Sequence, residues 1–82
     1  MRCDVLLFAQ ARDLADGRDR VQLSLRDEAS VRDAIDALMQ QHPSMQPLRN
    51  RLAIALDEKY VSIDTPLRDG CTLALIPPVS GG

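Results

Sequence analysis

The residues with the clearest chemical potential stand at the end of the sequence, in the segment Pro77-Pro78-Val79-Ser80-Gly81-Gly82. Proline has no N–H and a fixed φ, so Pro77 and Pro78 should end strand pairing and hold the following residues as a stiff arm. Six extended residues span roughly 20 Å. Gly81 and Gly82 have no side chains, so the end of this arm could enter a passage too narrow for other residues. The pattern predicts that the rest of the chain presents the terminal carboxylate of Gly82.

The other reactive side chains form no recognisable site. Cys3 and Cys71 are the only cysteines and His42 is the only histidine, which is too few for a metal-ligand set, so no metal is expected. Both cysteines lie in strand-like runs and are expected to be small buried hydrophobes. His42 precedes Pro43 at a predicted helix end, where a capping role is favoured. No nucleophile–base pair is evident.

Composition restricts the class of protein. The chain has 82 residues, enough for one domain, with 45% apolar and 27% charged residues, which is typical of a globular protein. The net charge of −2 and the aromatic content of 2% argue against a nucleic-acid partner, and the charge argues against an anionic membrane. No apolar run approaches the length of a membrane-spanning helix, and the N-terminus lacks a signal-peptide pattern. We therefore expect a cytoplasmic protein.

The elements that must position the tail can be read from hydrophobic periodicity. Apolar runs and alternation predict five strands, at residues 2–9, 19–26, 52–56, 60–63 and 71–76. A short helical turn is expected at 10–16, and a loop with one helical turn at 44–51. Between them, Ser30 and Asp33 form a capping pattern for a helix that should end by His42, before Pro43. Its apolar stripe comprises Val31, Ala34, Ile35, Leu38 and either Met39 or His42.

This order of elements predicts an α+β domain with one main helix across one face of a mixed sheet of about five strands. The first and last strands should lie side by side and parallel, as in the ubiquitin-like β-grasp arrangement, although other small α+β folds share the order. We expect a β-grasp domain at residues 1–76 and an extended reactive tail at 77–82.

A second candidate site is the sheet face opposite the helix. Strand parity places five apolar side chains there or beside it: Leu6, Phe8, Tyr60, Ala74 and Ile76. An exposed apolar patch next to the root of the tail would be a typical protein–protein site, with the two aromatic side chains as anchors. The alternative is that the 44–51 loop covers part of it.

Three segments together resemble one known family. The Pro77–Gly82 ending follows the last strand directly, Phe8-Ala9-Gln10-Ala11-Arg12-Asp13 is similar to a Phe-Ala-x-x-Arg-acidic segment, and Pro66-Leu67-Arg68-Asp69-Gly70 to a Pro-Leu-x-Asp-Gly turn. On these residues the chain resembles the small subunit of molybdopterin synthase, the MoaD-type sulfur-carrier proteins. The family often has asparagine at the position of Asp57 and an acidic residue at that of Cys71, and the second departure implies that Cys71 could be half-exposed.

The resemblance implies a chemistry for the tail. An activating enzyme would adenylate Gly82 with ATP, and sulfur from a donor persulfide would displace AMP to leave a terminal thiocarboxylate, a 1-thioglycine. In the synthase large subunit this group would donate its sulfur to cyclic pyranopterin monophosphate. The implied assembly has two small subunits flanking a dimer of large subunits. The small subunit itself would bind no cofactor, and the catalytic groups would lie on the large subunit.

Two alternatives stay open. The chain could carry sulfur for another pathway, such as thiamine thiazole synthesis or tRNA thiolation, or act as a protein modifier, although those relatives tend to lack the Pro-Pro-Val-x-Gly-Gly ending. It could also be a β-grasp interaction module whose tail has no covalent role. The terminus could also be a frayed end without function. A frayed end, however, would require neither the two prolines nor the glycine pair.

Overall fold

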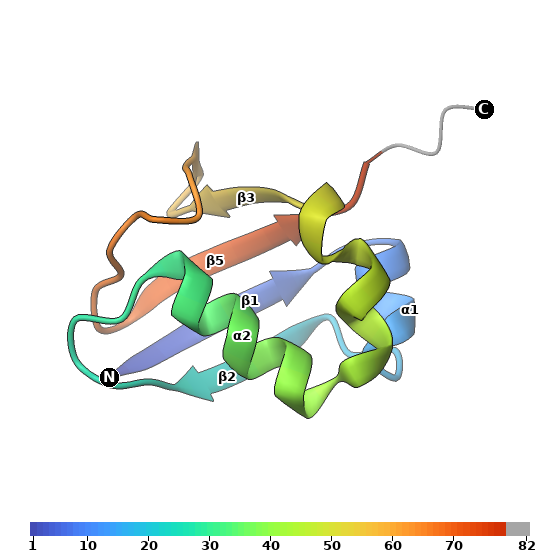
Figure 1. The fold of residues 1–82 in the computed structure, drawn as a ribbon, viewed down its shortest axis with the longest axis horizontal. Coiled ribbons are helices and arrows are strands. Elements are labelled where there is room, and N and C mark those ends of the chain that lie inside the picture. The colour runs from blue at the N-terminus through green and yellow to red at the C-terminus, as the bar shows by residue number, and fades with distance from the viewer. Residues whose placement is uncertain (79–82) are drawn as a thin grey trace.

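A five-stranded mixed sheet with one main helix across one face forms the body of the computed structural model, which describes residues 1–78 (Figure 1). The elements in chain order are β1 (Arg2–Leu7), α1 (Gln10–Leu14), β2 (Arg20–Ser24), α2 (Val31–Gln41), the 3₁₀ helix η1 (Pro43–Arg51), β3 (Ala53–Leu56), β4 (Lys59–Tyr60) and β5 (Cys71–Ile76). The strand order is β2-β1-β5-β3-β4, with β1 and β5 parallel at the centre and the other pairs antiparallel. The predicted α+β architecture and the parallel first and last strands are confirmed.

Helix α2 begins at a reciprocal cap. The backbone N–H of Asp33 donates to Ser30 Oγ at 3.4 Å, and the N–H of Ser30 donates to Asp33 Oδ2 at 2.9 Å. The bond from Ser30 N–H holds the pKa of the Asp33 carboxyl below its ordinary value. The helix ends where the N–H of His42 bonds to the carbonyl of Leu38 at 2.8 Å, one residue before Pro43. Both predicted helix boundaries are confirmed.

The core lies between α2 and the inner face of the sheet. The inward side chains of β1 and β5 are almost fully buried: Cys3, Val5, Leu7, Cys71, Leu73 and Leu75. They pack against the apolar stripe of α2, which consists of Val31, Ala34, Ile35, Leu38 and Met39. This single layer of contacts fixes β5, and therefore the base of the tail, relative to the rest of the domain.

The two cysteines belong to this core. They are direct partners in the parallel pairing of β1 and β5, and their Sγ atoms lie 3.2 Å apart as free thiols. Cys71 is only 4% exposed, so the expectation of a buried hydrophobe is confirmed for it as well as for Cys3. Burial, reinforced by the neighbouring thiol, raises the pKa of Cys3 to about 12. Such a thiol is a poor nucleophile near neutral pH.

Four strand predictions were too long, and the smallest difference is at β3, which begins at Ala53 instead of residue 52. β1 ends at Leu7 instead of residue 9, because Ala9 adopts a φ of 51° at the start of α1, and its side chain is exposed instead of facing the core. β2 covers only residues 20–24. β4 contains only Lys59 and Tyr60; Val61 N–H still bonds to the Ile54 carbonyl at 3.0 Å, but the chain then turns between Ser62 and Thr65.

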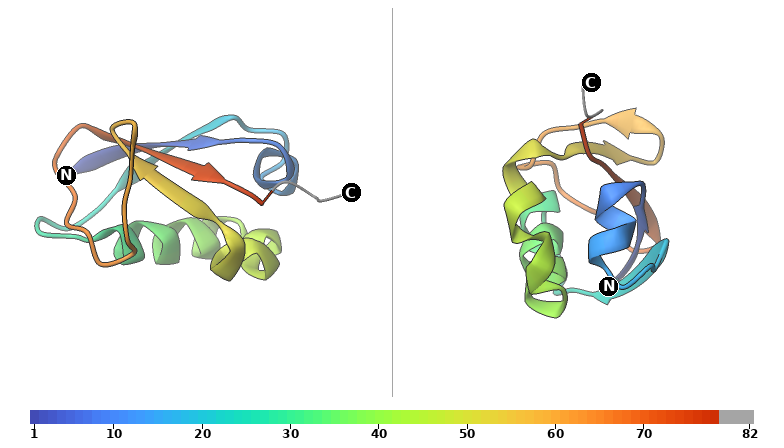
Figure 2. Two further views of the ribbon diagram at one scale, coloured as in Figure 1. Left: turned by 90° about the horizontal axis from the view of Figure 1, so that it is seen from above. Right: turned by 90° about the vertical axis from the view of Figure 1, so that its right-hand side faces the viewer.

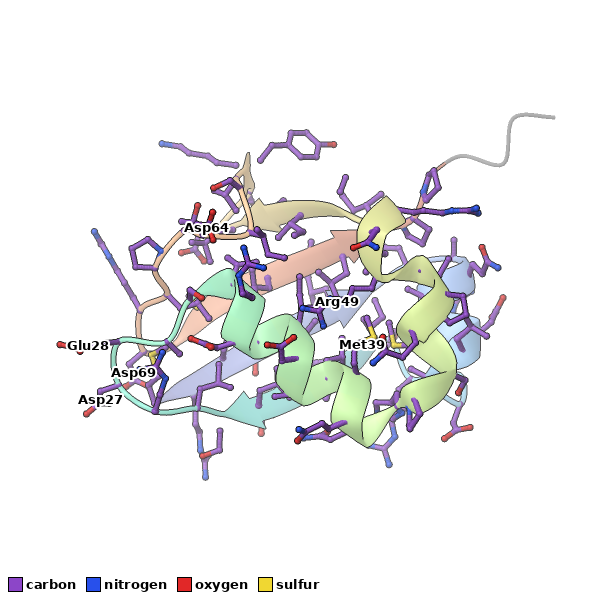
Figure 3. The ribbon with its side chains drawn as sticks, viewed as in Figure 1. Asp27, Glu28, Met39, Arg49, Asp64 and Asp69 are labelled. Atoms are coloured by element: carbon purple, nitrogen blue, oxygen red, sulfur yellow. The ribbon has the colours of Figure 1, made fainter. Side chains whose placement is uncertain are left out.

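The segment 43–51 was predicted as a loop with one turn, and this was incomplete. It forms the 3₁₀ helix η1, which buries Met45 and Leu48 in the core and packs beside α1 and α2. Figure 2 shows it in the same layer as α2, below the sheet. Figure 3 shows Arg49 of η1 directed toward α2, where it forms an ion pair with Asp36. Because η1 lies on the helix side, it does not cover the opposite sheet face. The alternative that the 44–51 segment covers part of the apolar patch is therefore wrong.

Candidate functional site

The root of the tail is at the end of the central strands. β5 stops at Ile76, after which Pro77 is buried and Pro78 is exposed. The chain leaves the sheet at the end of the molecule that carries α1 (Figures 1 and 2). The remaining predicted tail residues, Val79, Ser80, Gly81 and Gly82, lie outside the described residues. Burial of Pro77 anchors the base of the predicted arm against the domain.

Strand pairing gathers the five predicted patch residues on the sheet face away from α2. One row crosses the sheet through the directly paired residues Leu6, Ala74, Ala55 and Tyr60. Next to the tail, Phe8 follows the Leu7–Leu75 pair and so lies level with Ile76, which pairs with Ala53. We call the set Leu6, Phe8, Tyr60, Ala74 and Ile76 the outer apolar patch. With Ala55 of β3 between Ala74 and Tyr60, these residues form one surface across four strands, and it borders Pro77.

The outer apolar patch is open to solvent. Among the described residues, the large hydrophobic side chains that are exposed to solvent are Phe8, at 45%, and Tyr60, at 76%. Leu6, Ala74 and Ile76 are half-buried. Part of the patch forms a groove of about 520 Å³, lined by Leu6, Phe8, Ala55, Asp57, Glu58, Thr72 and Ala74. Exposed aromatic side chains beside a groove are typical of a protein-binding surface.

A polar row on the same face was not predicted from the sequence. Asp4 pairs with Thr72, and Asp57 and Glu58 form the β3–β4 turn next to them. Thr72 N–H donates to Asp57 Oδ1 at 3.0 Å, and Asp57 N–H donates to the Thr72 carbonyl at 2.9 Å, so the turn is tied to β5. We call Asp4, Asp57 and Glu58 the acidic band. The alternation of Asp4, Leu6 and Phe8 along one strand was the available signal.

Within residues 1–78 the structure offers a binding surface without a visible reaction centre. No group of three or more histidine, cysteine or acidic side chains in this range could hold a metal ion. None of the helices formed by these residues has the length and apolar character needed to cross a membrane. The feature that stands out in the described residues is therefore the exposed apolar surface beside Pro77.

Comparison with known proteins assigns the family. The family model described as the ThiS family matches residues 5–82. The chain belongs to the ThiS family. Among its relatives is the molybdopterin synthase sulfur carrier subunit of Chlamydomonas reinhardtii, 33% identical over 84 aligned residues that cover all of both chains. The resemblance to these sulfur carriers, drawn from three short segments, is confirmed over the full length.

Solved structures of several other proteins share the fold. A protein described as a putative molybdopterin converting factor subunit 1 from Pyrococcus furiosus superposes with a TM-score of 0.86 at 31% identity, covering 96% of this chain and 99% of that one. SAMP1 from Haloferax volcanii gives a TM-score of 0.91 at 28% identity, with complete coverage of both chains. The ubiquitin-like β-grasp fold is therefore confirmed. One of these neighbours is described as a putative molybdopterin converting factor subunit and another as a small archaeal modifier protein.

Proposed function

We propose that this chain is the sulfur carrier subunit of a molybdopterin synthase. In this proposal residues 1–76 form the docking domain and residues 77–82 form the reactive arm. The observation that carries it is the position of the outer apolar patch, which borders the point where the chain leaves the sheet. A partner that covers Phe8 and Ile76 receives the arm directly beside its own surface. The full-length likeness to named molybdopterin synthase carriers supports the same role.

The reactive atom is proposed to be the carboxylate carbon of Gly82. A carboxylate is a poor electrophile, so an activating enzyme first joins it to AMP from ATP with release of pyrophosphate. The outer sulfur of a persulfide donor then attacks the acyl carbon and displaces AMP, which forms an acyl disulfide. A thiol reduces this disulfide, so that a terminal thiocarboxylate remains and the donor sulfur leaves in a new disulfide. The buried thiols Cys3 and Cys71 take no part, because they are enclosed in the core and the pKa of Cys3 is raised to about 12.

The partners follow from this sequence of steps. The activating enzyme and the sulfur donor load the tail, and the large subunit accepts it and holds the pterin precursor. Donation of sulfur to cyclic pyranopterin monophosphate returns the carrier as a carboxylate, and two loaded carriers are consumed for each dithiolene. We propose a heterotetramer of two small and two large subunits. No cofactor is held by the chain itself, so loading is detected only as 1-thioglycine at residue 82.

The direct test is reconstitution with purified proteins. The thiocarboxylated chain, its large subunit from the same organism and cyclic pyranopterin monophosphate should yield molybdopterin, with the carrier recovered as the carboxylate. A matched sample of unmodified chain provides the control. Absence of product with a loaded carrier that binds the large subunit would refute the assignment to this pathway.

A second candidate is supported by the likeness to SAMP1 of Haloferax volcanii, which is named a small archaeal modifier protein. A modifier would use the same activated Gly82 to form an isopeptide bond with a lysine of another protein. Peptide mapping of lysates that contain the tagged chain distinguishes the two roles. Lysine side chains that carry the tryptic remnant of residues 69–82, which follows Arg68, indicate a modifier. Their absence together with molybdopterin formation indicates the carrier alone.

A further inference from the structure

We propose that Cys3 and Cys71 form an oxidation site, at which a peroxide converts the two buried thiols into a reversible disulfide between the central strands β1 and β5. The site is separate from the outer apolar patch and from the tail, so the inference does not depend on the proposed function. It gives the two cysteines a chemistry of their own, which the sulfur-carrier role does not use.

The backbone holds the two cysteines in the position that a disulfide requires. Cys3 and Cys71 are direct partners in the parallel pairing of β1 and β5. Neighbouring strands lie about 4.8 Å apart, which falls within the Cα–Cα range of about 4.4–6.8 Å found in disulfides. Gly70 N–H donates to the Arg2 carbonyl at 2.7 Å, and Arg2 N–H donates to Asp69 Oδ1 at 2.7 Å. These two bonds fix the register of the strands beside the cysteines.

The sulfur atoms are already in contact. Their Sγ atoms lie 3.2 Å apart, and both side chains are buried in the core. A disulfide bond measures about 2.05 Å, so each sulfur has to move by only about 0.6 Å toward the other. Among residues 1–78, no third histidine, cysteine or acidic side chain joins the pair to complete a metal site, and two thiols are too few for a structural zinc ion. The geometry therefore favours a covalent bond over a bound metal.

An oxidant can approach the pair from the side of Cys71. This cysteine lines a surface groove of about 610 Å³ together with Pro66, Leu67 and Arg68 of the preceding connection. The two cysteines are also the first pair in the β1–β5 register, at the end of the sheet that carries the N-terminus (Figure 1), and strand ends open more readily than strand centres. Because Cys71 is only 4% exposed, the access suits a small peroxide and not a bulky disulfide such as oxidised glutathione.

The reaction with hydrogen peroxide balances in two steps. The Cys71 thiolate attacks one peroxide oxygen, the O–O bond breaks, and the released hydroxide takes up the thiol proton, which leaves a sulfenic acid and one water. The Cys3 sulfur then attacks the Cys71 sulfur, the S–O bond breaks, and the hydroxyl leaves with the Cys3 proton as a second water. The two thiols lose two electrons, and the peroxide gains them.

The geometry assigns the first attack to Cys71 and the second to Cys3. Cys71 lines the groove, whereas Cys3 is only 1% exposed. Burial raises the pKa of Cys3 to about 12, so this thiol is seldom ionised and would react slowly with free peroxide. In the second step its sulfur already touches the sulfur that it attacks, and this proximity compensates for a weak nucleophile.

The disulfide would join distant parts of the sequence. Cys3 and Cys71 are 68 positions apart, so the bond strongly restricts the unfolded chain. The melting temperature should therefore rise by about 10–20 °C on oxidation. Cys71 and Ile76 are at opposite ends of β5, about 17 Å apart, so the bond leaves the root of the tail unchanged.

The test uses the purified full chain in its folded state. The chain is treated with hydrogen peroxide, remaining thiols are alkylated in urea, and tryptic peptides are mapped without a reductant. Wild type should yield residues 3–12 joined to residues 69–82 with the loss of two hydrogen atoms, and dithiothreitol should separate them. Neither peptide contains methionine, so oxidation of methionine cannot obscure the result. Thermal unfolding of the same samples gives the melting temperatures.

Two single variants test the order of the steps. Cys3→Ala leaves Cys71 without a second thiol, so Cys71 should accumulate as a sulfenic acid that dimedone traps. Cys71→Ala removes the sulfur that lines the groove, so Cys3 should remain a thiol over the same period. Neither variant should gain thermal stability with peroxide. Dimedone labelling of Cys3 in Cys71→Ala, with none of Cys71 in Cys3→Ala, would overturn the assigned order.

The wild-type result decides the inference even where a variant fails to fold. Two cysteines that both remain thiols after treatment would overturn it, as would a disulfide between two chains. A Cys3–Cys71 bond that forms only in urea would also overturn it, because the folded register would then not bring about the reaction. An unchanged melting temperature of the oxidised chain would refute the stabilisation. None of these outcomes bears on sulfur transfer by Gly82.

Discussion

The exposed ring of Phe8 gives the sharpest test of the outer apolar patch as a docking surface. Phe8 follows β1, lies level with Ile76 at the root of the tail, and is 45% exposed in the free chain. Its backbone carbonyl accepts the bond from Ala11 N–H at 3.0 Å, and a substitution by alanine leaves this bond in place. Phe8→Ala should therefore affect binding more than folding.

The size of the effect follows from the exposed area. A phenylalanine side chain presents about 200 Å², so the exposed 45% corresponds to about 90 Å² that a partner could cover. At about 25 cal/mol per Å² this amounts to about 2 kcal/mol, or an approximately 40-fold weaker Kd. Most of the loss should be found in a faster dissociation rate, because the ring contributes short-range packing instead of long-range attraction.

The assay is titration of the large subunit with wild type, Phe8→Ala and the control Gln40→Ala. Gln40 is exposed on α2, on the opposite side of the sheet, so its replacement should change the Kd less than about twofold. Thermal unfolding must show that all three chains are folded. A folded Phe8→Ala chain whose Kd is within about threefold of wild type would refute the reasoning. Such a small change would mean that the large subunit does not bury the exposed part of the Phe8 ring.

Three further predictions concern the fold. Ser30→Ala removes the acceptor for Asp33 N–H and should lower the free energy of unfolding by about 1 kcal/mol, whereas the exposed Ser24→Ala should have little effect; urea titration compares them. Glu58→Gly relieves a φ of 74° and should raise the free energy of unfolding by about 0.5 kcal/mol, while Glu58→Ala, which keeps the strain, should not. Burial raises the pKa of Cys3 from 9.0 to about 12, so the unfolded chain loses this proton first. The contribution of the protonated Cys3 thiol to the free energy of unfolding should be complete below pH 9. Above pH 9 it should fall by about 1.4 kcal/mol per pH unit, up to about pH 12. Urea titrations between pH 8 and 11 should show this fall for wild type and a smaller one for Cys3→Ala.

Much of this fold could be predicted because its signals are local. Ser30 and Asp33 marked the start of α2 and Pro43 marked its end, and both mechanisms involve residues within one helical turn. The bounds of β5 were predicted correctly because Gly70 precedes it and Pro77 follows it. The five patch residues could be assigned to one face because side chains alternate along each strand.

The features that were missed depend on tertiary contacts. η1 contains Pro47 and has no 3.6-residue periodicity, and its only signal was the three-residue spacing of the buried side chains Met45 and Leu48, which matches a 3₁₀ turn. β4 stops although β3 continues to Ala53, because the chain turns away between Ser62 and Thr65, and residues 60–63 carry no local signal for that turn. The acidic band was missed because Asp4 and Asp57 approach each other only through β5.

The central claim is that Gly82 carries the transferred sulfur, and intact mass spectrometry tests it most directly. The chain is incubated with ATP, the activating enzyme and a persulfide donor, alongside samples without ATP and samples of a chain that lacks Gly82. The account predicts replacement of one oxygen by sulfur in the full chain, mapped to residue 82, and no change in either control. An unchanged mass in the complete reaction, or a sulfur adduct that persists after deletion of Gly82, would contradict it.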